Sequence, residues 1–356
     1  MRHEIIVPTG YMGSGSSAVT DYLSEFAKIN VPNGSFEYIF MHCPDGIFDL
    51  EDKLLIGNTS IRSDEAIYRF KKQMEFLYKD CTFWAGNYRK NISVNFLKYV
   101  DVFLNDISTF DLENTYWYFQ QMQVDLRMKL LYFLRRVIRI ATLRHVTWKE
   151  PLRYPSMVVA FPTKSEYYDA AKKFIGSIVD DVANSYNNIV LDQFLLPHNL
   201  YRMPNYFDGN CKAIVVERDP RDVFVLNKYI WKSKNVSVPY PFEVVSFCKY
   251  YKRMRECEHF VETSDILRLH FEDLVYKYDE TSKKINDFLN ISEKEHTNKF
   301  EHFDPKVSKK NTLVFNKIKG VEEEIQIIER ELKDYLYAFD SADITQSFES
   351  TSSSFF

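Results

Sequence analysis

A cluster of glycines and serines near the start of the chain could bind an anion. Residues 9–17 read TGYMGSGSS, and three of the ten glycines of the 356-residue chain lie within six positions, at Gly10, Gly13 and Gly15. Glycine adopts positive φ and lets other groups approach the backbone closely, as a ligand-wrapping loop requires. The apolar run at 5–7 predicts a buried strand before the loop, and apolar residues at helical spacing from Ala18 predict a helix after it.

A strand, a glycine loop and a helix in this order favour a phosphate or sulfate site. Backbone N–H groups and the positive end of a helix dipole meet at such a loop. Further hydroxyl donors come from Ser14, Ser16 and Ser17. The stretch from Gly10 to Ser17 matches the nucleotide-binding pattern G-x-x-x-x-G-K-[ST], except that Ser16 replaces the lysine. The alternative is a plain turn between strand and helix that holds no ligand.

A second stretch, KAIVVERDPRDVFV at 212–225, places an arginine directly after an apolar strand. Pro220 suits the first turn of a helix. Arg218 would then lie at the carboxyl end of the strand, on the sheet edge where the glycine loop also lies. A guanidinium there can bind a phosphate through two hydrogen bonds. The alternative is an Arg–Asp pair that caps the helix.

The coarse pattern alternates strands with helices, which predicts an α/β fold with a parallel sheet covered by helices on both faces. Further strands are predicted at 188–192, 212–217 and 265–271. Helices are predicted at 64–79, 112–146, 164–184, 220–230, 241–261, 279–290 and 321–339. Residues 1–340 are expected to form one domain, in which 60–165 is a helical insertion over the ligand edge of the sheet. The serine-rich tail 341–356 is expected to be disordered.

Composition favours an intracellular globular protein. The hydrophobic fraction is 45% and the net charge is −4, which gives no global indication of nucleic-acid binding. The five cysteines are scattered without a C-x-x-C pair and suit reduced thiols. The first predicted strand leaves no room for a signal peptide, and no apolar run reaches the length of a membrane span. We therefore expect a cytoplasmic location.

Together these stretches resemble the sulfotransferase family, whose members use 3'-phosphoadenosine 5'-phosphosulfate (PAPS) and have a P-loop-like, three-layer fold. The family's loop for the 5'-phosphosulfate corresponds to Gly13, Ser14, Gly15, Ser16 and Ser17. Its motif for the 3'-phosphate is matched by the run RDPRDV that begins at Arg218. Its third motif appears as FEDLVYKYDETSKKINDFLN at 271–290. The resemblance implies that PAPS is the co-substrate and that no metal is needed.

The chain departs from the family's motifs in two places. The basic residue of the loop falls on Gly13, and a serine eight residues after the motif arginine falls on Leu226, next to Asn227. We expect the Asn227 amide to replace that serine. Lys309 and Lys310 are the candidates for the missing cation, since the family often places basic residues of its C-terminal region on the cofactor. The alternative is a pair of solvated lysines that touch no cofactor.

Three residues are candidates for the general base that removes the acceptor's proton. Glycan-type members place a glutamate about two dozen residues after the basic position of the loop, where this chain has Glu37. The strand end before the motif arginine supplies Asp192, and His198 follows a few residues later. We rank them in the order Glu37, Asp192, His198, with His42 as a weaker candidate. Each has a plain alternative as a surface, capping or loop residue.

The insertion contains a basic amphipathic stretch. From Arg127 to Lys149 it carries seven basic residues and no acidic residue. It could face an anionic glycan, or lie on a membrane surface that holds a lipid-linked acceptor. The alternative is a helix with a solvated basic face.

The sequence therefore predicts a PAPS-dependent sulfotransferase that acts on a hydroxyl of a carbohydrate-like acceptor. One alternative is a P-loop small-molecule kinase, favoured by the loop and by Asp192 at a strand end. The other is a catalytically silent nucleotide-binding protein, favoured by the missing loop lysine.

Overall fold

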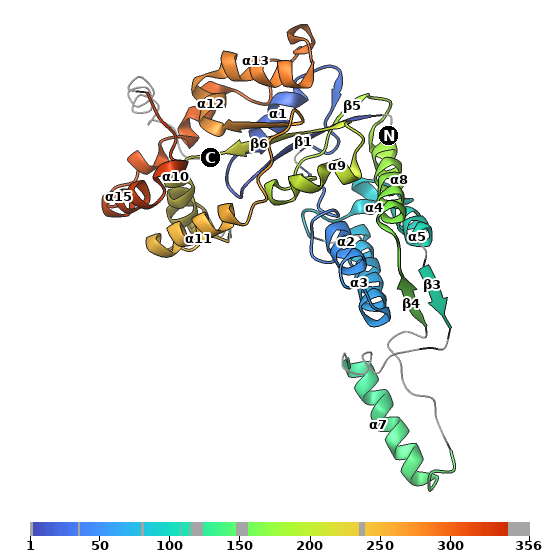
Figure 1. Cartoon of the computed structure of the whole chain (residues 1–356). Helices are drawn as coiled ribbons and strands as arrows, with labels where there is room; N and C mark the ends of the chain where they lie inside the picture. Colours follow the sequence, from blue (N-terminus) through green and yellow to red (C-terminus); the bar gives the residue numbers. More distant parts are fainter. Residues whose placement is uncertain are drawn as a thin grey trace.

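A parallel five-stranded sheet forms the centre of the molecule (Figure 1). The computed structural model describes residues 3–34, 36–79, 82–107, 109–113, 115, 124–146, 156–234 and 239–340. The strand order is β2-β5-β1-β6-β7, with all neighbours parallel. The strands are β1 (Glu4–Gly10), β2 (Ile29–Asn30), β5 (Asn188–Val190), β6 (Cys211–Glu217) and β7 (Ile266–His270). The predicted α/β fold with a central parallel sheet is confirmed.

Both faces of the sheet are buried, which explains why its strands are apolar runs rather than alternating ones. On β1, Ile5 and Val7 point into one core and Ile6 into another. Successive side chains of a strand point to opposite faces, so a single strand contributes to both cores.

One face of the sheet is covered by helices that follow the glycine loop and the last strand. These are α1 (Ser17–Ser24), α12 (Phe271–Tyr276) and α13 (Tyr278–Leu289). The other face packs on helices from the middle of the chain, which share one core with the sheet. These are α2 (Ile47–Leu55), α3 (Ser60–Tyr78), α4 (Tyr88–Asn91), α5 (Phe96–Asp106), α8 (Lys164–Val182) and α9 (Met203–Tyr206).

A third apolar cluster joins the helix after β6 to the C-terminal region. It contains α10 (Pro220–Val225), a π-helix (Leu226–Trp231), α11 (Val244–Glu256) and α15 (Glu322–Glu331). Between α13 and α15 lies the short α14 (Pro305–Ser308). Short 3₁₀ turns occupy Pro197–Arg202, Lys232–Lys234, Glu293–Glu295, Lys309–Asn311, Val314–Asn316 and Lys333–Tyr335.

The insertion is predicted to be helical, but in the structure it also contains two strands. Strands β3 (Thr109–Leu112) and β4 (Met157–Ala160) pair in an antiparallel ribbon. The helix predicted from 112 begins only at Leu126, as α7 (Leu126–Ala141), because the Asp125 side chain caps it by accepting from the Met128 N–H at 2.8 Å. Figure 1 shows α7 beyond the far end of the ribbon.

The last predicted helix is also shorter than expected. Its α-helical part ends at Glu331 rather than at 339. The buried Asp219 carboxylate accepts from the backbone N–H of Tyr337 at 3.0 Å, which holds the chain in a different direction. The tail 341–356, Cys81 and Lys149 lie outside the described residues.

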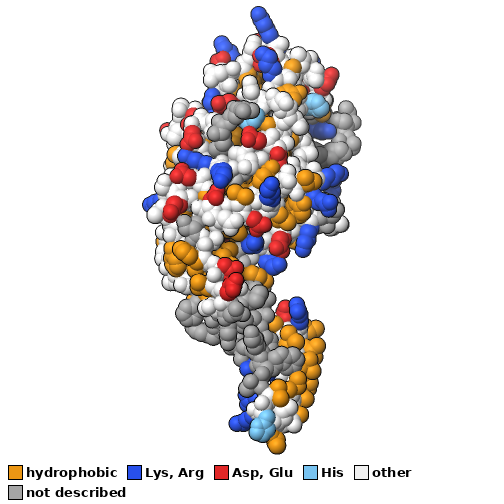
Figure 2. All heavy atoms as spheres, turned by 90° about the vertical axis from the view of Figure 1, so that its right-hand side faces the viewer, with side chains coloured by type: hydrophobic (Ala, Val, Ile, Leu, Met, Phe, Trp, Pro, Cys, Tyr) orange, Lys and Arg blue, Asp and Glu red, His pale blue; other side chains and the backbone are white. Residues whose placement is uncertain are grey.

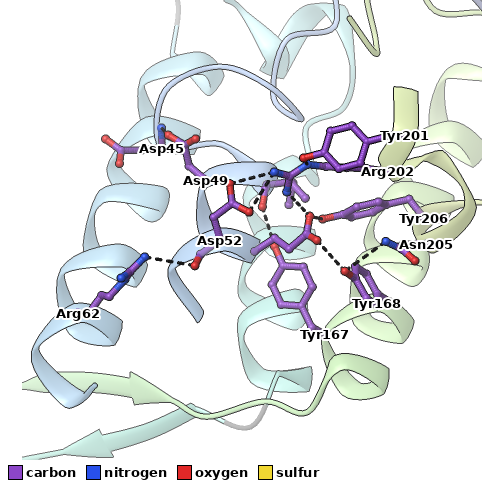
Figure 3. A network of polar contacts seen from close by, with 12 residues as sticks. Asp45, Asp49, Asp52, Arg62, Tyr167, Tyr168, Tyr201, Arg202, Asn205 and Tyr206 are labelled. Carbon is purple, nitrogen blue, oxygen red and sulfur yellow. Dashed lines mark hydrogen bonds and ion pairs between the residues drawn. The ribbon is translucent and has the colours of Figure 1, made fainter. Parts of the chain in front are cut away.

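A buried polar network attaches α2 to the chain around α9 (Figure 3). Glu51 of α2 accepts from Arg202 at 2.6 Å, from Tyr206 at 2.7 Å and from Tyr168 at 2.6 Å. Arg202 also binds both oxygens of Asp52 at 3.0 Å. Because burial of an unpaired charge is costly, every member of the network depends on the others.

No helix within the described ranges has both the length and the apolar character needed to cross a bilayer.

Candidate active site

Each glycine of the 9–17 stretch has a positive φ angle or a neighbour too close for a Cβ atom. Gly13 and Gly15 have φ of 76° and 86°, in the left-handed region that other residues avoid. A Cβ on Gly15 would lie 2.9 Å from the ring of Phe271, and a Cβ on Gly10 would lie 2.5 Å from the carbonyl oxygen of Val216. The loop is thus packed closely between β6 and the start of α12, and it is more than an ordinary turn.

The loop's serines differ in their surroundings. Ser14 is buried, and its Oγ has no hydrogen-bond partner among the described residues. Ser16 accepts a hydrogen bond from Gln193 at 2.8 Å, and Ser17 begins α1. A buried hydroxyl without a hydrogen-bond partner is costly. The contact of Ser14 with a phosphosulfate stays a prediction.

Arg218 connects the glycine loop to the C-terminal segment. Its guanidinium donates to the carbonyl oxygen of Gly13 at 3.1 Å and to the carbonyl oxygen of Asn311. It also lies 5.0 Å from the centre of the Phe271 ring, on which Gly15 packs. All three sequence motifs therefore meet around one guanidinium, and its Nε is buried without a partner among the described residues.

The acidic residues near Arg218 have structural partners. Asp219 caps α10 and forms a two-point ion pair with Arg221. Glu272 accepts from the Asp219 N–H at 3.0 Å, and Asp222 accepts from the Phe315 N–H at 3.1 Å. Burial raises the pKa of Glu272 to about 8 and that of Asp222 to about 6. The capping alternative therefore describes Asp219 and Arg221 well, whereas Arg218 points toward the loop.

The two lysines proposed to replace the loop cation lie in the same region. Lys309 and Lys310 directly precede Asn311, whose carbonyl oxygen binds Arg218. The carbonyl oxygen of Lys310 accepts from Lys317 at 3.1 Å, which fixes the turn that carries them. Their contact with a cofactor stays a prediction.

Gly13 has a neighbour that the sequence did not reveal. A Cβ at this position would lie 2.6 Å from Cη2 of Trp231, the last residue of the π-helix. The space that a side chain at position 13 would need is thus filled by an indole ring. This accounts in steric terms for the absence of the family's basic residue there.

A different cation lies next to the loop. The Arg255 guanidinium is 3.9 Å from the centre of the Tyr11 ring and donates to Glu217 at 2.6 Å. Its Nη1 is buried without a partner among the described residues. Arg255 lies on α11, and no family motif covers that position, so only the folded chain identifies it.

The side-chain amide of Asn227 has a hydrogen-bond partner within the protein. Its amide donates to the carbonyl oxygen of Tyr240 at 3.2 Å, and its buried Oδ1 has no partner among the described residues. The structure thus assigns its donor to the loop before α11, and its expected role as a substitute for the family's serine stays a prediction.

The first two base candidates are brought together. Asp192 follows β5, and its carbonyl oxygen accepts from the N–H of Tyr38 at 3.0 Å, directly after Glu37. Burial raises the pKa of Glu37 to about 7. Burial, and then the charge of Glu37, raise the pKa of Asp192 to about 7. The charge of Glu37 thus acts on the Asp192 carboxyl group, which places the two side chains near each other.

Gln193 joins this pair to the glycine loop. It holds φ of 54°, donates to Ser16 at 2.8 Å and accepts from Thr9 at 3.2 Å. A non-glycine residue in the left-handed region often marks a functional site. The residue that follows Asp192 is in this way held against the glycine loop.

The histidine candidates already have backbone partners. His198 lies edge-on to Tyr11 at 5.9 Å, and its Nε2 is 3.1 Å from the carbonyl oxygen of Met254. Burial lowers the pKa of His42 to about 4, and its Nε2 is 2.8 Å from the carbonyl oxygen of Gln193. His198 therefore lies near the loop, while His42 supports the Asp192–Gln193 turn.

Two further observations concern other possible ligand sites. A cavity of about 180 Å³ lies beside Cys211 and Ile266, the first residues of β6 and β7, at the sheet edge opposite the glycine loop. Within the described parts of the chain, no group of three or more His, Cys, Asp or Glu residues could hold a metal ion.

Residues 179–335 match the model of the sulfotransferase domain, a range that includes the second and third motifs but not the glycine loop. No curated protein matches the sequence.

Among solved structures, the sulfotransferase domain from the curacin biosynthetic pathway is 14% identical, with a TM-score of 0.37 over 98% of this chain and 97% of that one. Retinol dehydratase in complex with androsterone and inactive cofactor PAP is 14% identical, with a TM-score of 0.31 over 96% and 82% of the two chains. A sulfotransferase from Mycobacterium avium is 10% identical, with a TM-score of 0.35 over 94% and 76%. The predicted resemblance to the sulfotransferase family is confirmed over residues 179–335, which match the model of that family's domain.

Proposed function

We propose that the chain transfers a sulfuryl group from PAPS to a hydroxyl of a carbohydrate-like acceptor, with Glu37 as the general base. The observation that carries the proposal is the Glu37–Asp192 carboxyl pair beside the glycine loop, with both pKa values raised to about 7. A base with a pKa near the working pH is both ionised and basic enough to take a proton.

In the proposed reaction, Glu37 takes the proton of the acceptor hydroxyl while the oxygen of that hydroxyl attacks the sulfur of PAPS in line. The S–O bond to the phosphate breaks, and adenosine 3',5'-bisphosphate leaves with the electron pair. The protein's contribution is to orient both reactants and to stabilise the departing charge. Ser14, Ser16 and Ser17 would hold the phosphosulfate, and Arg218 would bind the 3'-phosphate with Lys309 and Lys310 nearby.

The acceptor class rests on Glu37. Glu37 lies in the segment after the first helix, where glycan-type sulfotransferases have their base. The Glu37 side chain is half-buried beside Asp192. Burial is proposed to give Glu37 the basicity that the reaction needs.

The test is a transfer assay with ³⁵S-labelled PAPS and a panel of mono- and oligosaccharides, beside phenolic and lipid alcohols as competing acceptor classes. Glu37→Gln is expected to cut turnover about a hundredfold or more, because the general base is lost. Asp192→Asn should keep most of the activity. Both variants should bind adenosine 3',5'-bisphosphate as the parent does, which separates loss of catalysis from loss of the nucleotide site.

Other outcomes would overturn parts of the proposal. Full activity of Glu37→Gln together with loss in Asp192→Asn would transfer the role of base to Asp192. Labelling of phenols or lipid alcohols in place of sugars would refute the acceptor class. Turnover of ATP with Mg²⁺ in place of PAPS would show a kinase.

A further inference from the structure

Helix α7 exposes a continuous apolar face. Leu126, Leu130, Phe133, Val137 and Ile140 follow one another at intervals of four and three residues, which places them on one side of the helix. Leu126, Phe133 and Ile140 are 84%, 62% and 66% exposed. Figure 2 shows the outer side of this helix as an apolar surface.

The other side of the helix is less exposed. Met128 is buried, and Leu131 and Ile138 are half-buried. These residues lie on the side of the helix opposite the stripe, so the stripe is a separate face. A contiguous apolar face left in water usually marks an interaction surface.

Basic side chains border the apolar stripe. Lys129 and Arg136 each precede a stripe residue by one position, and Arg127 follows one, so they lie along its two edges. All three are exposed, as are Arg139 and Arg144. The sequence from 126 to 146 contains no acidic residue.

This charge pattern argues against a second copy of the chain as the occupant. Two α7 helices packed through their stripes would bring Lys129, Arg136 and Arg127 of both copies to the same interface. With no carboxylate between 126 and 146 to pair with them, like charges would face each other. The face fits a partner that is apolar at its centre and negatively charged at its edges.

We propose that α7 binds an anionic membrane surface, lying in its plane. The stripe would enter the boundary between headgroups and acyl chains, and the arginines and lysine would contact lipid phosphates and carboxylates. A helix of 16 residues is about 24 Å long, too short to span a bilayer but sufficient to lie on one. This inference does not depend on the acceptor proposed above.

The experiment is vesicle flotation of the full chain with phosphatidylcholine vesicles that contain or lack phosphatidylserine. Phe133→Ser/Val137→Ser should weaken binding to the anionic vesicles at least about tenfold, since two apolar side chains no longer enter the bilayer. Arg136→Glu/Arg139→Glu should weaken it at least about thirtyfold, and added salt should weaken binding of the parent.

Matched controls make the same chemical changes elsewhere on the surface. Ile56→Ser/Val94→Ser replaces two exposed apolar residues, and Lys283→Glu/Lys284→Glu reverses two exposed charges on α13. Both should bind vesicles as the parent does. All variants should unfold at the same denaturant concentration as the parent, because none of the changed side chains is buried.

Any of three outcomes would overturn the proposal. These are absence of vesicle binding by the parent, equal binding to neutral and anionic vesicles, or equal losses in the α7 variants and their controls. A concentration-dependent dimer that Phe133→Ser/Val137→Ser abolishes would assign the face to a second copy of the chain instead.

Discussion

Substitution of Gly13 by alanine tests how the loop is confined. Gly13 has φ of 76°, and a Cβ there would lie 2.6 Å from Cη2 and 3.0 Å from Cζ3 of Trp231. Two costs are therefore expected: the strain of a non-glycine residue in the left-handed region, and displacement of the indole ring.

The chain offers a control that separates the two costs. Gly209 has φ of 81°, but no heavy atom lies within 4 Å of the position that its Cβ would take. Gly209→Ala should therefore lower the free energy of unfolding by the strain alone, about 1–2 kcal/mol. Gly13→Ala should lose that amount plus about 1–3 kcal/mol for overpacking against Trp231, or roughly 2–5 kcal/mol in total.

The assay is urea unfolding of both variants, of Trp231→Ala and of the double variant Gly13→Ala/Trp231→Ala. In the double variant the crowding is relieved, so the two changes should be less than additive by about 1 kcal/mol or more. Gly13→Ala should also weaken binding of adenosine 3',5'-bisphosphate more than Gly209→Ala does, as measured by titration, because a displaced loop binds the nucleotide more weakly.

Equal destabilisation by Gly13→Ala and Gly209→Ala, with additive effects in the double variant, would refute the reasoning. It would mean that Trp231 moves aside at no cost and does not explain the missing basic residue. If the reasoning holds, Gly13→Lys should not raise turnover above that of the parent unless Trp231 is also reduced in size.

The remaining predictions concern other parts of the site and the network that supports it. Glu51→Ala should lower the free energy of unfolding by about 1–3 kcal/mol, measured by denaturant titration, because buried Tyr206 and half-buried Tyr168 lose their acceptor while Arg202 keeps Asp52. A loss as small as that of an exposed carboxylate would contradict this. Arg218→Ala should weaken binding of adenosine 3',5'-bisphosphate more than binding of 5'-AMP in calorimetry. Equal losses of affinity for both nucleotides would show that Arg218 does not bind the 3'-phosphate. Turnover should rise as the pH increases through about 7, because burial raises the pKa of Glu37 to about 7 and the base acts only when ionised. A rate that stays flat between about pH 5 and about pH 8 would exclude a carboxylate with a raised pKa as the base.

The sequence by itself determined the parallel sheet, the glycine loop and the two motifs after β6 and β7. These are local features: apolar runs predict buried strands, glycines report φ and close approach, and an arginine after a strand lies at the ligand edge by topology alone. Asp192 and Glu37 were proposed as alternatives, because nothing in the sequence relates two residues so far apart.

The tertiary structure decided the contacts between distant segments. It brought Glu37 to Asp192, placed Trp231 over Gly13 and Arg255 on Tyr11, and turned the Asn227 amide toward Tyr240. The same limit explains the errors in the insertion, since β3 forms by pairing with a strand much later in the chain. Side-chain direction and strand pairing depend on long-range packing, whereas propensity and spacing report only on neighbours along the chain.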